Sequence, residues 1–237
     1  MINKSEILVV VPARSGSKGL IDKNIRLFDN EPLVVRTIKQ ANEIFEPEQV
    51  FLSTDSKNYL NIVKKYTNFK YDYIRPKNLS EDDSTNKDYL LDIIDYSENV
   101  LQLKFSWILI LQCTSPLRKN SHIDKAIESI EDDVDMITSV HLTDSNPFYL
   151  HRLINNENNL VPLFDNKYTR RQDCPPVYEL NGLFHLINIS SLRKKNIVEF
   201  KNVKPVIINK KYSSDIDDEL DFRVAEMLYN TLNNESE

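Results

Sequence analysis

Two uninterrupted apolar runs constrain the fold of this chain more than any other feature of its sequence. Residues 7–11 read Ile-Leu-Val-Val-Val and end at Pro12, and residues 107–111 read Trp-Ile-Leu-Ile-Leu. Neither run alternates between polar and apolar residues, so both faces of each strand must be covered, as in a parallel sheet. The first run is also far too short for a signal sequence or a membrane span.

Strands and helices are expected to alternate along the rest of the chain. Apolar residues at helical spacing predict helices after Pro32, at 57–66, at 88–100, after a capping box of Ser121 and Asp124, and at 219–232. Shorter apolar stretches predict strands at 50–53, 71–74, 135–141, 183–189 and 203–208. This β-α-β alternation is typical of an α/β fold with a doubly wound, mainly parallel, Rossmann-like sheet.

The alternation breaks between residues 142 and 180, a polar, Asn-rich stretch that contains Pro. We interpret it as a small arm inserted into a single domain of residues 1–237. Phe148, Tyr149, Leu150 and Leu153 offer apolar contacts, which favours a role in oligomerisation. The alternative is an ordinary surface loop with a small core of its own.

Composition excludes some partners. The net charge of −6 over 237 residues argues against a broad surface for nucleic acid or for an anionic membrane. It leaves room for a small anionic ligand, which needs only local positive charge. The two cysteines, Cys113 and Cys174, are typical of reduced thiols, so we expect a cytoplasmic protein.

The segment that follows the first apolar run is rich in glycine and in cations. Residues 12–24 hold two of the three glycines, Gly16 and Gly19, together with Arg14, Lys18 and Lys23. Ligands of open parallel sheets bind beyond the carboxyl ends of the strands, and such a loop suits a phosphate. The glycine spacing matches neither the Walker nor the dinucleotide pattern. We therefore interpret it as a phosphate-binding loop of another kind, with a solvated basic turn as the alternative.

Asp215 and Asp217 form a second candidate site. Residues two apart in an extended segment point to the same side, so both carboxylates can face one cation. Hard oxygen ligands beside a triphosphate suit Mg²⁺. The alternative is a helix N-terminus capped by these acids.

Taken together, these motifs resemble the acylneuraminate cytidylyltransferases, the CMP-sialic acid synthetases. The likeness begins with residues 11–24 and continues in family order along nearly the whole chain. Its further landmarks are Ser53-Thr54-Asp55, Arg75-Pro76, Leu111-Gln-Cys-Thr-Ser-Pro-Leu-Arg118, Arg171-Gln172-Asp173, Asn181-Gly182 and the acidic run 215–221.

The resemblance implies roles for individual residues. Those implied in nucleotide binding are Ala13, Arg14, Ser17, Lys18, Lys23, Asn24, Arg75 and Thr85. Those implied in sugar binding are Gln112, Arg171, Asn181 and Gly182, with Arg171 as partner of the substrate carboxylate. Asp215 and Asp217 would hold Mg²⁺ or Mn²⁺. Arg14, Lys23 and Asp217 would be catalytic, the cations by stabilising the departing pyrophosphate and Asp217 as the candidate general base.

The implied reaction is transfer of CMP from CTP to the anomeric hydroxyl of a nine-carbon 2-keto sugar acid, with release of pyrophosphate. The family also implies a homodimer in which the arm of each subunit reaches the partner's site. His185 stands where many relatives carry Tyr, so N-acetylneuraminic and legionaminic acids both stay open, with pseudaminic acid less favoured. The rival functions are a Kdo-type cytidylyltransferase and a non-catalytic nucleotide-binding relative.

Overall fold

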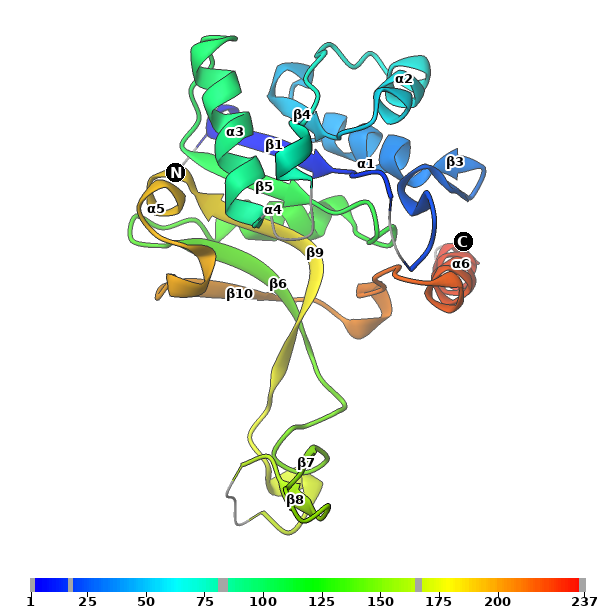
Figure 1. Ribbon diagram of the computed structural model, residues 1–237, viewed down its shortest axis with the longest axis vertical. Coiled ribbons are helices and arrows are strands. Elements are labelled where there is room, and N and C mark those ends of the chain that lie inside the picture. The colour runs from blue at the N-terminus through cyan, green and yellow to red at the C-terminus, as the bar shows by residue number, and fades with distance from the viewer. Residues whose placement is uncertain (1–2, 17–18, 81–84, 165–167, 235–237) are drawn as a thin grey trace.

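A computed structural model describes residues 3–16, 19–80, 85–164 and 168–234, and these residues build a six-stranded central sheet (Figure 1). Its strand order is β10-β6-β9-β5-β1-β4. The strands are β1 (Ile7–Pro12), β4 (Val50–Ser53), β5 (Trp107–Leu111), β6 (Met136–Leu142), β9 (Tyr178–Asn188) and β10 (Val203–Ile207). All run in one direction except β9, which is antiparallel to both of its neighbours. The expected doubly wound, mainly parallel sheet is confirmed.

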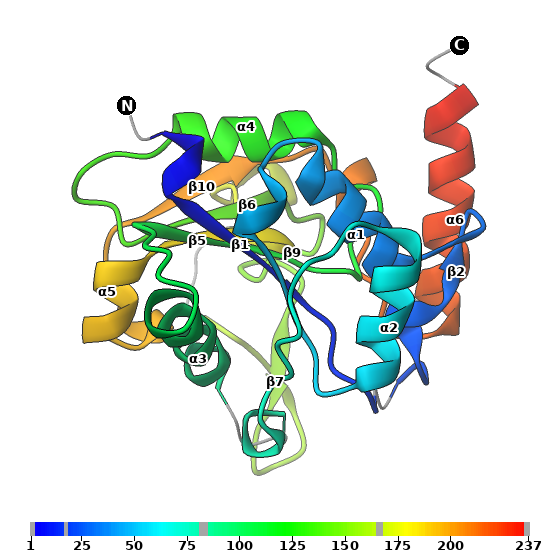
Figure 2. The ribbon, with the colours of Figure 1, turned by 90° about the horizontal axis from the view of Figure 1, so that it is seen from above.

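Helices cover both faces of this sheet (Figure 2). They are α1 (Leu33–Asn42), α2 (Lys57–Tyr66), α3 (Asn86–Asn99), α4 (Asn120–Glu128), α5 (Ile189–Lys194) and α6 (Glu219–Asn234). The side chains of α1, α2, α4 and α6 share one apolar core, and those of α3 and α5 share a second. None of the described helices has the length and apolar character needed to cross a bilayer.

The first strand explains why its sequence shows no alternation. Ile7, Val9 and Val11 point into the core beneath α1 and α2, while Leu8 and Val10 point into the core beneath α3. All five side chains are completely buried. Each strand of this kind therefore contributes apolar area to two cores at once, which is the main source of stability in such a fold.

The strand predicted at 71–74 is wrong. This segment is extended and Tyr71 stacks on Phe51 of β4, with ring centroids 4.3 Å apart, but no ladder forms. Its apolar residues are held by side-chain packing, and the chain reaches β4 through one backbone bond, from Arg75 N–H to Thr54 O (2.8 Å). Burial of aromatic residues produced the strand-like pattern without pairing.

The capping box predicted for α4 is also wrong. The helix begins at Asn120 with Lys119 as the N-cap, two residues before the predicted N-cap Ser121. Asp124 pairs instead with Lys4 at 2.9 Å, near the start of the chain. Asp124, which the local pattern predicts to be part of a cap, forms an ion pair with a residue distant in sequence.

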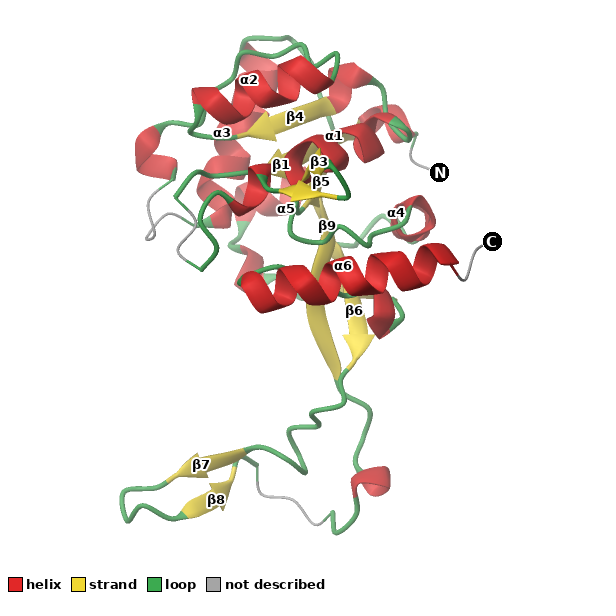
Figure 3. Cartoon of the chain, turned by 90° about the vertical axis from the view of Figure 1, so that its right-hand side faces the viewer, coloured by secondary structure: helices red, strands yellow, loops and turns green. Residues whose placement is uncertain are grey.

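Residues between β6 and β9 project from the sheet as an arm (Figure 3). Its tip carries the hairpin of β7 (Arg152–Ile154) and β8 (Leu160–Pro162). Phe148 contacts Phe164 and Tyr168, with ring centroids 5.1 and 6.1 Å apart, so the arm has a small aromatic core. Leu153 and Leu160 nevertheless stay exposed. The arm's role as a dimer contact stays a prediction.

Candidate active site

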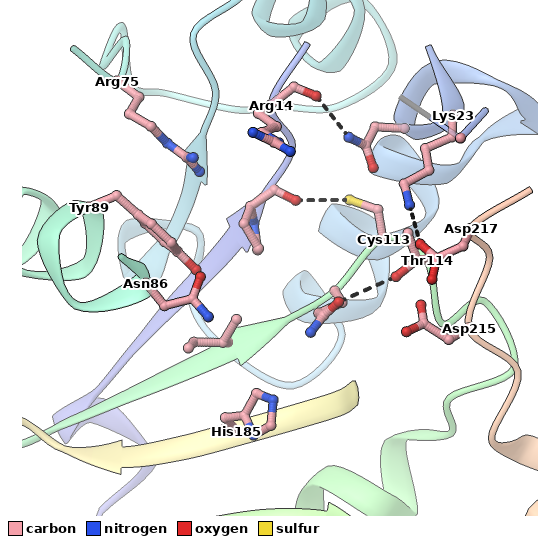
Figure 4. Close-up of a pocket in the computed structure, with 15 residues that line it drawn as sticks. Arg14, Lys23, Arg75, Asn86, Tyr89, Cys113, Thr114, His185, Asp215 and Asp217 are labelled. Carbon is pink, nitrogen blue, oxygen red and sulfur yellow. Dashed lines mark hydrogen bonds and ion pairs between the residues drawn. The ribbon is translucent and has the colours of Figure 1, made fainter. Parts of the chain in front are cut away.

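A cavity of about 510 Å³ lies at the edge where β1 and β5 end (Figure 4). Because β9 runs in the opposite direction, its amino-terminal half reaches the same edge. The predicted site residues that line this cavity are Arg14, Lys23, Asn24, Arg75, Gln112, Asp215 and Asp217. The fold thus gathers residues from four separate parts of the chain into one place, as expected for the carboxyl edge of an open sheet.

The glycine- and cation-rich loop, residues 12–24, is fixed by hydrogen bonds to neighbouring elements. Asp55, just after β4, accepts hydrogen bonds from Ser15 N–H (2.7 Å) and from Ser15 Oγ (2.9 Å). Further along, the Tyr59 hydroxyl of α2 donates to Asp22 Oδ1 at 2.8 Å. The backbone of the loop is therefore held at two points, and Arg14 and Lys23 of the loop line the cavity. Ser17 and Lys18 lie outside the described residues.

The remaining nucleotide candidates in this loop have different environments. Asn24 is buried and donates to the carbonyl of Arg14 at 3.1 Å, which fixes the backbone beneath that cation. Ala13 belongs to the hydrophobic core and its N–H donates to Ser53 O at 2.9 Å. Asn24 therefore faces the cavity directly, whereas Ala13 could act through its backbone position.

The loop also touches the acidic segment near the end of the chain. Lys23 Nζ donates to Asp217 Oδ1 at 2.8 Å and to Ile216 O at 2.9 Å. A Cβ on Gly19 would lie 2.4 Å from the carbonyl oxygen of Asp217, so this approach is possible only for glycine. The two segments form one continuous wall of the cavity.

Asp215 and Asp217 both line this wall. The side chains that bond the N–H groups near the start of α6 belong to other acids, not to this pair. Asp221 accepts from the N–H groups of Asp217 and Asp218 at 3.0 and 3.1 Å, and Asp218 accepts from Asp221 N–H at 2.9 Å. Burial raises the pKa of Asp215, and the negative charge of Asp217 raises it further. A hydrogen bond from Thr114 acts in the opposite direction but is outweighed. A carboxyl group whose charge is disfavoured by a neighbouring carboxylate suits a cation shared by the two.

The described residues contain no group of three or more acidic, histidine or cysteine side chains that could hold a metal. A cation at Asp215 and Asp217 would therefore take most of its ligands from water and substrate. Mg²⁺ typically binds in this way, through one or two carboxylates and phosphate oxygens. The donor set fits the predicted metal, whose binding stays a prediction.

The opposite wall is built around a buried arginine (Figure 4). Arg75 donates from Nε to Ser53 Oγ at 2.8 Å and from Nη2 to Ser53 O at 2.9 Å. Its guanidinium lies 4.2 Å from the centre of the Tyr89 ring on α3, and its burial lowers its pKa. Thr85 is the exposed N-cap of α3, where its hydroxyl bonds Asp88, and the neighbouring Asn86 reaches the cavity instead.

Three of the four predicted sugar-binding residues, Gln112, Asn181 and Gly182, meet at a bulge in β9. The pairing of β9 with β6 shifts register between Thr138 and Val140, which leaves residues 181–184 of β9 as the irregular part. Gly182 has a φ of +67°, and a Cβ there would lie 3.5 Å from both Gln112 Nε2 and Asp215 Oδ2. Asn181 is buried beside it and donates to Ser213 Oγ at 2.9 Å. The bulge thus lies between the acidic segment, residues 215–221, and the loop that follows β5, residues 112–117, which we call the Gln112 loop.

Arg171 is the one predicted sugar ligand that lies on the arm. It occupies a short 3-10 helix, Arg171–Asp173, and donates to Asp144 O at 2.8 Å. Its side chain does not line the cavity formed by the described residues of its own chain.

His185 and Tyr89 both line the cavity. The strand alternation around His185 leaves it facing either the pocket or solvent, and the helical spacing of Tyr89 predicts packing alone. His185 Nδ1 lies 2.8 Å from Thr138 Oγ1, and burial lowers the pKa of the imidazole. Tyr89 follows Asn86 by one helical turn, so the helix spacing alone places both on one face. Burial raises the pKa of Cys113 to about 12, which argues against a role for this thiol as a nucleophile.

The family model described as "Cytidylyltransferase" matches residues 8–235, nearly the whole chain. The chain belongs to the cytidylyltransferase family. The predicted resemblance to acylneuraminate cytidylyltransferases is confirmed by similar proteins. An N-acylneuraminate cytidylyltransferase of Streptococcus agalactiae serotype V is 32% identical over 219 residues, which cover 91% of this chain and 51% of that protein. This cytidylyltransferase therefore spans about half the length of that relative.

A relative of similar length is the CMP-N,N'-diacetyllegionaminic acid synthase of Legionella pneumophila. It is 30% identical over 225 residues, which cover 94% of this chain and 95% of that protein. Among solved structures, a CMP:2-keto-3-deoxy-manno-octonic acid synthetase complexed with CTP has a TM-score of 0.68 at 13% identity, over 95% of this chain and 99% of that one. At this identity the structural likeness supports the fold alone.

Proposed function

We propose that this cytidylyltransferase transfers CMP from CTP to the anomeric hydroxyl of a nine-carbon 2-keto sugar acid of the N-acetylneuraminic or legionaminic type. The observation that carries the proposal is the meeting of Arg14 and Lys23 with Asp215 and Asp217 in one cavity. Basic side chains that can bind a triphosphate and carboxylates that can bind a metal ion are thus within reach of the same ligand. The relatives named for sialic and legionaminic acids favour this substrate class.

In the proposed reaction, the anomeric oxygen attacks the α-phosphorus of CTP in line. A bond forms between that oxygen and phosphorus, and the bond to the bridging oxygen of pyrophosphate breaks. Arg14 and Lys23 neutralise the charge that develops on the leaving pyrophosphate. Asp217 accepts the hydroxyl proton, directly or through one water. Arg75 and Asn86 bind the substrates on the opposite wall.

Mg²⁺, or Mn²⁺, is the cofactor that we propose for Asp215 and Asp217. When bound, it would supply positive charge against the phosphate oxygens. Removal of the ion with EDTA should abolish pyrophosphate release, and excess Mg²⁺ should restore it. In Asp217→Asn the release should fall to near background while CTP still binds, whereas near-normal release would contradict this assignment.

We also propose a homodimer in which each arm supplies Arg171 to the partner's cavity. The exposed Leu153 and Leu160 of the arm, and the location of Arg171 away from its own cavity, support this arrangement. A mixture of two inactive variants tests it. Arg171→Ala and Asp217→Asn, unfolded and refolded together in equal amounts, should recover about a quarter of wild-type turnover through mixed dimers. No recovery, or a strict monomer by light scattering, would contradict the arrangement.

The substrate is tested by a panel of sugar acids. Pyrophosphate release should be measured with CTP, Mg²⁺ and, in turn, N-acetylneuraminic, N,N'-diacetyllegionaminic, pseudaminic and Kdo acids. Release with one of the first two would support the proposal and name the substrate. Release with Kdo alone would favour the eight-carbon rival, and silence across the panel with CTP bound would favour a non-catalytic role.

The cytoplasm is the compartment that we propose, because CTP is made there. Cys113 and Cys174 are both free thiols in the structure, as a reducing compartment would keep them.

A further inference from the structure

Arg118 is a buried cation whose guanidinium has no carboxylate partner among the described residues. Only 5% of its surface is exposed, and burial lowers its pKa to about 10. It follows the Gln112 loop at the end of β5, in the segment that leads to α4. Burial of an unpaired cation is costly, so a residue of this kind calls for an explanation beyond packing.

The guanidinium is satisfied by neutral acceptors from three parts of the chain. Its Nη1 donates to Gln112 O at 3.0 Å and to Leu183 O at 2.7 Å, and its Nε donates to Gln40 Oε1 at 3.0 Å. Gln40 of α1 returns the contact, since its Nε2 donates to Arg118 O at 2.7 Å. A planar group with donors in fixed directions can join these acceptors, whereas a lysine would contact fewer of them at once.

Two of these acceptors belong to the predicted sugar side of the cavity. Gln112 is itself a cavity residue, and Leu183 follows Gly182 in the bulge of β9. The regular pairing of β5 with β9 extends only to Leu111 and Phe184, so the ladder does not fix what lies beyond. Arg118 bridges the two segments just beyond the Leu111–Phe184 pair.

We propose that Arg118 is a positioning residue, which holds the Gln112 loop and the β9 bulge at the separation that the sugar acid requires. The inference rests on the proposed function of the cavity, and it gives Arg118 no contact with substrate. Loss of this bridge should therefore affect the sugar acid more than CTP, because the nucleotide is bound mainly by the loop at residues 13–24.

The test compares Arg118→Met with a matched control at the other end of the sheet. Gln49 is also buried, and its Nε2 donates to Lys4 O and Ile7 O, both at 2.7 Å, near the start of β1. Gln49→Met thus removes side-chain bonds to two backbone carbonyls far from the cavity. Gln40→Met is the milder companion, since it removes one acceptor and keeps the cation.

Arg118→Met should raise the KM of the sugar acid by on the order of tenfold or more, with the KM of CTP changed less than about twofold. Gln40→Met should show the same split at smaller size, and Gln49→Met should show none at a similar loss of stability. Arg118→Lys should restore little, since one ammonium cannot replace the fork. Equal changes in both KM values, or the same split in Gln49→Met, would overturn the proposal.

Hydrogen exchange gives a readout that does not depend on turnover. In Arg118→Met, amides of residues 181–184 and of the Gln112 loop should exchange faster than in the wild type, while Gln49→Met leaves them unchanged. Unchanged protection at these amides would overturn the positioning role even if activity falls. A wild-type protein that is silent with every sugar acid would instead count against the proposed function.

Discussion

The ammonium of Lys23 lies 2.8 Å from the carboxylate of Asp217, and this pair joins the first loop of the chain to its last acidic segment. The Lys23 side chain is 17% exposed and that of Asp217 is 77% exposed, so the pair lies at the cavity wall. A triphosphate that enters would compete with Asp217 for Lys23 and release that carboxylate to other partners. We therefore expect Lys23 to link occupation of the proposed nucleotide site to the interactions of Asp217.

Replacement of Lys23 tests this link. Lys23→Met should lower kcat by roughly 10²-fold or more, because a charge that stabilises the leaving group is lost. The free energy of unfolding should change by less than about 1 kcal/mol, since ion pairs with an exposed partner contribute little. Steady-state pyrophosphate release and urea unfolding measure the two effects. Lys64→Met, a surface control paired with Asp72, should leave kcat unchanged. A normal kcat in Lys23→Met would remove this residue from the mechanism.

Gly19→Ala should disturb the same contact by steric means. The added Cβ would meet Asp217 O at 2.4 Å, so one of the two segments must move away. We expect kcat/KM to fall by on the order of 10²-fold, since a small misplacement of the phosphate-binding cations is enough. Gly16→Asn in the same loop is the control, because its φ of +73° is accessible to Asn and nothing lies within 4 Å of the new Cβ. Comparable losses in the two variants would mean that loop flexibility, not this contact, is limiting.

Asp55 is expected to act on CTP through the loop that it holds. Asp55→Ala removes both acceptors of Ser15 and should raise the KM of CTP roughly tenfold, in line with two charge-assisted hydrogen bonds. In that background, Ser15→Ala should cost little more, because its hydroxyl has already lost its partner. A double-mutant cycle on CTP binding measures this coupling. Fully additive effects would show that Asp55 acts elsewhere.

Asp135 should make stability depend on pH. It is buried at the start of β6, and hydrogen bonds from Ser191 Oγ and from the N–H groups of Asn202 and Lys201 hold its pKa at about 2. A carboxyl whose pKa is lower in the folded state stabilises the fold above the unfolded value, near pH 4, and this stabilisation is lost as the pH falls towards 2. Asp135→Asn should therefore cost about 2 kcal/mol at pH 7.

The difference between the wild type and Asp135→Asn should shrink below pH 4. Urea unfolding of both proteins between pH 7 and pH 3 gives the two curves. Asp132→Asn, at an exposed position, is the control and should show no difference at any pH. A difference that stays constant down to pH 3 would mean that the ionised carboxylate is not the stabilising form.

Features that leave a local trace could be predicted from the sequence. Burial on both faces gives β1 and β5 continuous apolar runs, and their carboxyl ends then locate Arg14, Lys23 and Gln112. The topology then brings these residues together, because the carboxyl ends of parallel strands lie at the same edge of the sheet. This is why a cavity with cations on one loop and carboxylates on another could be expected before the structure.

Other features depend on contacts between distant segments and leave no such trace. The alternation around His185 is the same for a parallel and an antiparallel strand, so the sequence could not show that β9 runs backwards or that His185 faces the cavity. Tyr89 belongs both to the apolar face of α3 and to the cavity wall. Its helical spacing is explained fully by packing, so the sequence gives no sign that it lines the cavity. Arg171 carries no sign of how far the arm extends from the sheet.

The antiparallel strand also orders events while the chain is being made. β4, β1 and β5 can pair as soon as residue 111 has been synthesised, but β5 and β6 are never neighbours, and only β9 can join them. Both strands therefore carry an open edge in the middle of the future sheet until residues 178–188 emerge, after the whole arm. In a nascent chain that pauses within the arm, β5 is unpaired on one side and β6 on both sides, because β10 has not been made either. Such a chain also lacks the walls that bear His185 and Asp215. Unpaired strand edges of this kind favour aggregation, so we expect such a chain to need protection before it can bind any ligand.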